Sequence, residues 1–123
     1  MRPAGYDPAA LATLDELLDL DVRVGTVVAV RPLRGARRPT LALTLDLGPG
    51  GRRLGCLESG SRDEPDQLVG LQVAAVVNLP PRVVAGTEVD AWLLSAADGQ
   101  GNRVLLLPER PLPEGSRVFE EQD

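Results

Sequence analysis

Two stretches of strict alternation restrict this chain to folds built mainly from β-strands. β-Branched residues occupy every second position from Val22 to Val30, and leucines do so from Leu41 to Leu47. A period of two places the alternating side chains on one face, so each stretch predicts a half-buried strand. The first run ends at Pro32, and the second ends in a Gly-Pro-Gly-Gly turn over residues 48–51.

The rest of the chain continues this pattern of short strands. Further strands are predicted over residues 52–57, 72–79, 88–95 and 103–107. The last two are joined by Asp98-Gly99-Gln100-Gly101, a sequence typical of tight hairpins. One helix is predicted over residues 9–18, with Asp7 and Pro8 at its start. Its apolar stripe consists of Leu11, Leu14, Leu17 and Leu18.

This order of elements favours an all-β fold. There is no alternation of strands with helices and no internal repeat, so a five-stranded Greek-key OB barrel is the first candidate and a β-sandwich the alternative. A length of 123 residues predicts one domain. We expect the barrel over residues 21–119, preceded by an arm and helix over 1–20 and followed by a tail over 120–123. Its last part, around residues 108–115, is a Pro-rich extension.

The composition excludes several classes of site. The chain has no His, no Lys and a single cysteine, Cys56. A Ser-His-Asp triad, a His-ligated or all-Cys zinc site and a P-loop are therefore impossible. An enzyme would depend on carboxylate or Arg chemistry alone, and no paired set occurs on one predicted element. We expect no catalytic residue, no cofactor and no metal site, and we expect Cys56 to be a packing residue.

Charge is distributed unevenly along the chain. Residues 21–62 carry eight Arg and three acidic residues, a net charge of +5, whereas the remainder carries five Arg and fifteen acidic residues. A basic face on an acidic protein is a candidate polyanion-binding surface. No signal peptide or long apolar run is visible, so we expect a cytoplasmic protein.

The first loop is the strongest candidate for phosphate binding. It contains Arg34, Arg37 and Arg38, and Arg31 lies at its entrance. In OB folds this loop flanks the ligand face, and Arg presents a planar fork that fits phosphate. Arg52 and Arg53 point to opposite faces of a strand, so at most one of them joins the patch. Trp92 is expected to fill the barrel or a contact between subunits rather than to stack on a base.

Four segments, in the same order, resemble the EMAP-type tRNA-binding domain family. They are DVRVGTVVAVRP (21–32), GARRPTLALTLDLG (35–48), GLQVAAVVNLPPRVVAG (70–86) and VLLLPERPLPEGSRV (104–118). The resemblance is greatest to the free-standing CsaA-like bacterial proteins and extends to the C-terminal domain of methionyl-tRNA synthetases. It implies an OB barrel, a homodimer and tRNA binding through shape and backbone, without catalysis or cofactor.

The resemblance also suggests site residues and an alternative function. If the chain binds RNA, we expect Asn78 and Arg82 to shape the wall beside the Arg-rich loop; the alternative for Asn78 is to cap a turn through its side-chain amide. The resemblance makes Ser59 and Ser61 candidate groove residues. The family's Ser-rich strand is replaced here by LGCLESGSRDEPD (54–66), which is acidic. The predicted RNA-binding set is therefore Arg31, Arg34, Arg37, Arg38, Arg53, Asn78 and Arg82. CsaA-like members are also described as chaperones, so the alternative is a dimeric module that binds unfolded or pre-secretory polypeptides.

Overall fold

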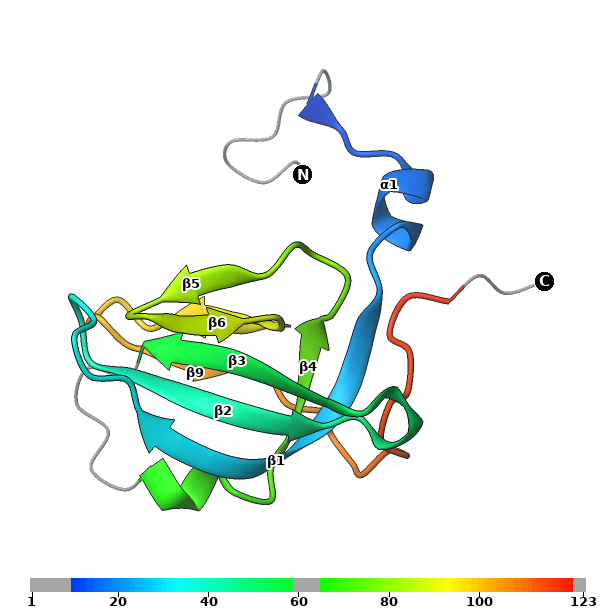
Figure 1. The fold of residues 1–123 in the computed structure, drawn as a ribbon. Helices are drawn as coiled ribbons and strands as arrows, with labels where there is room; N and C mark the ends of the chain where they lie inside the picture. Colours follow the sequence, from blue (N-terminus) through cyan, green and yellow to red (C-terminus); the bar gives the residue numbers. More distant parts are fainter. Residues whose placement is uncertain (1–9, 59–64, 121–123) are drawn as a thin grey trace.

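The computed structural model describes residues 10–58 and 65–120, which form a nearly closed antiparallel barrel (Figure 1). Its sheet has the strand order β3-β2-β1-β4-β7. The strands are β1 (Val22–Pro32), β2 (Thr40–Asp46), β3 (Arg52–Glu58), β4 (Gln72–Val76) and β7 (Trp92–Leu93). The prediction of an OB-like barrel is confirmed.

Two short hairpins and a few short helical segments complete the fold in the described part of the chain. The hairpins pair β5 (Arg82–Val84) with β6 (Thr87–Val89), and β8 (Ser95–Ala97) with β9 (Arg103–Leu105). The helical segments are α1 (Leu14–Leu18), η2 (Gly48–Gly50) and η3 (Pro65–Leu68). Within the two described ranges, no helix is long and apolar enough to cross a membrane.

The long strand β1 organises the barrel because it pairs on both sides. Its first half pairs with β4 and its second half with β2. A bulge between Val27 and Ala29 shifts the register with β2, so Val28 is an extra residue. The predicted alternation of buried residues is therefore wrong beyond Thr26: Val22 and Val24 are buried as expected, but Val27 is then buried and Val28 is only half-buried.

The barrel closes at one point between β3 and the residues before β7. The backbone N–H groups of Asp90 and Ala91 both donate to the carbonyl of Leu54, at 3.0 and 3.1 Å. The Leu54 N–H donates in turn to Asp90 Oδ1 at 2.8 Å. A strand over 88–95 is therefore wrong as one element: the chain leaves β6 at Asp90 to make this closure and then forms β7 and β8. Gly55 permits it, because a Cβ there would lie 2.8 Å from Leu93 Cγ.

Leucine and valine fill the interior between the curled strands. The core cluster includes Val27 on β1, Leu43 and Leu45 on β2, and Val73 on β4, all with no exposed surface. Leu57 on β3 and Leu93 on β7 pack against them. The alternation of leucines in the second predicted strand is thus confirmed as an inward-facing set.

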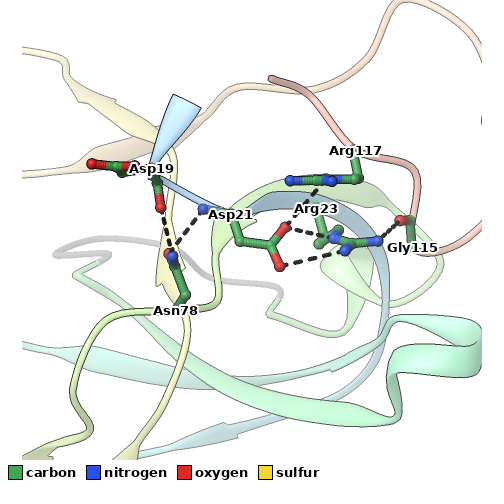
Figure 2. A network of polar contacts seen from close by, with 6 residues as sticks. All are labelled: Asp19, Asp21, Arg23, Asn78, Gly115 and Arg117. Carbon is green, nitrogen blue, oxygen red and sulfur yellow. Dashed lines mark hydrogen bonds and ion pairs between the residues drawn. The ribbon is translucent and has the colours of Figure 1, made fainter. Parts of the chain in front are cut away.

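The C-terminal segment lies beside the first residues of β1, along the part of this strand that precedes its pairing with β2. Val24 N donates to Ser116 O, and Gly115 N donates to Val24 O at 2.7 Å. Figure 2 shows the polar contacts around this junction. Asp21 accepts from Arg23 Nε at 2.6 Å and lies 3.8 Å from Arg117 Nε, so one carboxylate joins β1 to the C-terminal segment.

Helix α1 is shorter than predicted and lies away from the barrel (Figure 1). It has five residues and begins after Thr13, whose hydroxyl accepts from Glu16 N while the Glu16 side chain accepts from Thr13 N. This capping box fixes the start later than Asp7, which lies outside the described residues. Three leucines of the predicted apolar stripe remain exposed, Leu11, Leu14 and Leu17 at 59%, 68% and 39%, whereas Leu18 is half-buried.

Candidate nucleic-acid interface

Beyond the closure at Leu54, the barrel opens into a groove of about 620 Å³. Its floor is the second half of β3, with Cys56, Leu57 and Glu58. Arg82 and Trp92 also line the groove, as does the β8–β9 hairpin with Arg103. Arg38, at the end of the loop between β1 and β2, completes the rim. Three arginines from distant parts of the sequence therefore converge on one hollow.

Neutral groups hold two of these arginines in place. The Arg82 guanidinium carbon lies 3.9 Å from the centre of the Trp92 ring, and its Nη2 lies 3.6 Å from Cys56 Sγ. Arg103 donates through Nη2 to Ser95 O at 2.7 Å and through Nε to Ser95 Oγ at 3.0 Å. Among the described residues, neither Arg82 nor Arg103 forms an ion pair.

Arg38 is the groove arginine that has a carboxylate partner. Its Nη1 lies 3.4 Å from Glu58 Oε2, and the two side chains are 71% and 45% exposed. Such an exposed pair contributes little to stability and is readily exchanged for another anion. Among the described lining residues, the groove therefore presents three guanidinium groups and one carboxylate, which favours an anionic ligand.

Cys56 contributes a neutral thiol to the floor of the groove. Burial raises the pKa of the Cys56 thiol, Arg82 lowers it to a smaller extent, and Glu58 raises it. Desolvation therefore outweighs the nearby guanidinium, and the sulfur provides a polarisable, uncharged contact.

The Arg-rich loop lies at the same end of the barrel as the groove. Arg31 is exposed at the end of β1, opposite Ala42 on β2. Arg34 and Arg37 are exposed in the loop between β1 and β2, and Arg38 leads from this loop into the groove. The structure therefore brings Arg38 and Arg82, both predicted as RNA-binding residues, to one groove, with Arg34 and Arg37 preceding it in the loop.

Two predicted site residues lie elsewhere. Arg53 lines a separate hollow of about 210 Å³ together with Asp21 and Glu114. Asn78 accepts from Asp21 N at 2.8 Å and donates to Asp19 O at 2.7 Å (Figure 2). Its amide thus fixes the entry into β1, which is the turn-capping role its type favours. Ser59 and Ser61 lie outside the described residues.

Sequence reasoning missed Arg103 and the pairing of Arg82 with Trp92. Arg103 is 65 positions from Arg38 in the sequence and is the first residue of a strand that follows a hairpin turn. No sequence motif at this position indicates a function. The Asp98-Gly99 turn was the one sequence feature that could have placed Arg103, because it predicts that β9 folds back along β8. Among residues 10–58 and 65–120, no group of three potential metal ligands comes together.

Comparisons with known proteins agree with this architecture. The family model "Putative tRNA binding domain" matches residues 22–117. The methionine–tRNA ligase of Porphyromonas gingivalis is 37% identical over 120 residues, which cover 94% of this chain and 17% of the ligase. That of Methanococcoides burtonii is 34% identical over 108 residues, covering 88% of this chain and 16% of the ligase. The chain thus spans about a sixth of the length of these relatives.

Two solved structures show the same fold. The chaperone CsaA from Bacillus anthracis superposes with a TM-score of 0.82 at 35% identity, covering 89% of this chain and all of that one. A MetRS-related protein from Pyrococcus horikoshii superposes with a TM-score of 0.76 at 26% identity, covering 89% of this chain and 98% of that one.

Proposed function

Because this chain belongs to the tRNA-binding domain family, we propose that it binds tRNA without catalysis, through the Arg-rich loop and the groove beside it. The observation that carries the proposal is the convergence of Arg38, Arg82 and Arg103 on one hollow, whose described lining residues include one carboxylate, Glu58. RNA helices are recognised largely by shape and by contacts to phosphate and 2′-hydroxyl groups. Guanidinium groups suit this role because their planar fork matches phosphate. We also propose a cytoplasmic location, where a tRNA ligand is available.

A salt titration with tRNA tests the proposal. The purified protein is titrated into labelled mixed tRNA at several salt concentrations, and the logarithm of the association constant is plotted against that of the salt. Each phosphate that an Arg neutralises should contribute a slope of about −0.7 to −0.9. We expect a slope of about −2 or steeper, because three exposed arginines of the loop each neutralise a phosphate. Binding with no salt dependence would contradict the Arg-based mechanism.

A second function, polypeptide binding, is supported by the similarity to the CsaA chaperone. Under this alternative, an unfolded or pre-secretory segment lies in the groove, whose walls include the apolar Trp92 and Val84. The purified protein should then suppress thermal aggregation of a client protein at a few-fold excess. Full aggregation of the client in its presence, together with tRNA binding, would leave tRNA as the ligand.

We also propose that the protein is a homodimer whose contact includes α1. Leu11, Leu14 and Leu17 are exposed in the described chain, and five helical residues are too few to persist alone in water. The double substitution Leu14→Glu, Leu17→Glu should halve the mass measured by light scattering. Asp15→Lys, a polar neighbour on the same helix, should leave the mass unchanged. Equal masses for all three proteins would exclude α1 from the contact.

A further inference from the structure

We infer that the groove takes one unpaired nucleotide of the bound RNA, with its base stacked on the Arg82–Trp92 pair and its phosphate held by Arg103. This inference deepens the proposed function and rests on it. It assigns Trp92, Cys56 and Arg103 to the interface, beyond the arginines of the loop.

The Arg82–Trp92 pair is a ready stacking platform. The guanidinium lies over the indole with 3.9 Å between its carbon and the ring centre, and Trp92 is still 47% exposed. Bases stack both on aromatic rings and on guanidinium planes, so this pair offers a base two suitable surfaces. Cys56 Sγ accepts from Arg82 Nη2 at 3.6 Å and so helps to orient the guanidinium without adding a negative charge.

Arg103 is placed to bind the phosphate of the same nucleotide. Its two hydrogen bonds to Ser95 use two of the five N–H groups of a guanidinium, and the others remain for a ligand. Both contacts are to uncharged oxygens, so its positive charge is not neutralised. A guanidinium that is already oriented loses little conformational freedom when it binds phosphate.

The combination of features favours a nucleotide over a polypeptide. An aromatic platform and two unneutralised guanidinium groups lie in one groove of about 620 Å³. Every nucleotide carries a planar base and a phosphate a few bonds apart. A polypeptide matches both features only where an aromatic residue lies beside an acidic one.

The emission of Trp92 reports directly on this contact, because it is the one tryptophan in the chain. Mixed tRNA, a short single-stranded oligoadenylate, free AMP and an unfolded client polypeptide are titrated in separate experiments. We expect tRNA and the oligonucleotide to quench the emission by stacking, and AMP to do so only at much higher concentration, since it lacks neighbouring phosphates. The Cys56 thiol should react more slowly with a maleimide when tRNA is bound, because it lies on the groove floor.

Substitutions separate stacking from charge. Trp92→Ala should weaken the affinity for tRNA about 5- to 150-fold, the range measured for loss of one stacked base. Trp92→Phe, which keeps an aromatic face, should remain much closer to wild type. Arg82→Lys retains the charge but loses the planar group, so it should also weaken binding.

Arg110→Gln, a charge change on a residue outside the groove lining, is the matched control. Circular dichroism checks that each variant is folded.

The outcomes distinguish this inference from the proposed function. Salt-dependent tRNA binding with unchanged Trp92 emission and a Trp92→Ala affinity equal to wild type would overturn the nucleotide pocket and leave tRNA binding intact. Quenching by the polypeptide but not by RNA would also overturn it and assign the groove to a protein ligand. A wild-type protein that binds no tRNA would remove the proposed function and this inference with it.

Discussion

Replacing Gly115 by Ala should lower the stability of the barrel by about 3–4 kcal/mol, from two separate costs. Gly115 has φ +85°, a backbone conformation that costs a residue with a Cβ about 1–2 kcal/mol. A Cβ there would also lie 2.5 Å from the carbonyl oxygen of Leu47, which is backbone and cannot rotate away. The surrounding chain would have to shift, at a further cost of about 1–3 kcal/mol.

The shift would also disturb the contact between β1 and the C-terminal segment. Gly115 N donates to Val24 O, and its carbonyl accepts from Arg23 Nη1 at 3.1 Å (Figure 2). We expect the midpoint of thermal unfolding, followed by circular dichroism, to fall by roughly 10–15 °C. Gly99→Ala is the matched control, because Gly99 has φ +83° but no atom within 4 Å of the added Cβ. If the two variants unfold at the same temperature, the close contact with Leu47 contributes nothing.

The sequence predicted the strands of the barrel well because their patterns are local. Alternating leucines in β2 and the Asp98-Gly99 hairpin depend on neighbours a few positions away. Errors arose where distant residues decide the backbone. The bulge in β1 depends on the register with β2, and the break after β6 depends on Leu54, which accepts the hydrogen bonds of Asp90 and Ala91.

The part of the candidate site that was predicted also rests on a local pattern, and the part that was missed depends on contacts between distant residues. The Arg-rich loop is contiguous, so composition and position were enough to single out Arg37 and Arg38. The groove depends on closure of the barrel, because residues of β3 and of the β8–β9 hairpin line the same hollow. Periodicity does not reveal that Arg103 shares a hollow with Arg82, or that Trp92 lies under a guanidinium. These pairings appear only once the strand order is known.

The double substitution Arg37→Glu, Arg38→Glu should weaken tRNA binding by roughly 100-fold or more at low salt, since each charge-assisted hydrogen bond contributes about 1.5–3 kcal/mol. Both residues are exposed, and Arg38 extends the loop into the groove. Reversal replaces two attractive charges by two repulsive ones beside the phosphates. The salt dependence should also change: the slope of the double-logarithmic plot should lose about 1.5 in magnitude, because two phosphates are no longer neutralised.

This loss should come from the ligand contact and not from unfolding. The exposed pair of Arg38 with Glu58 contributes at most about 1 kcal/mol, so the variant should unfold at nearly the wild-type temperature. Arg110→Glu reverses one charge, half the change of the double variant, at a residue that does not line the groove, and it should bind tRNA almost as tightly as the wild type. Equal losses in both variants would mean that net charge, and not the loop, determines binding. A folded double variant with wild-type affinity would place the RNA on another face of the barrel.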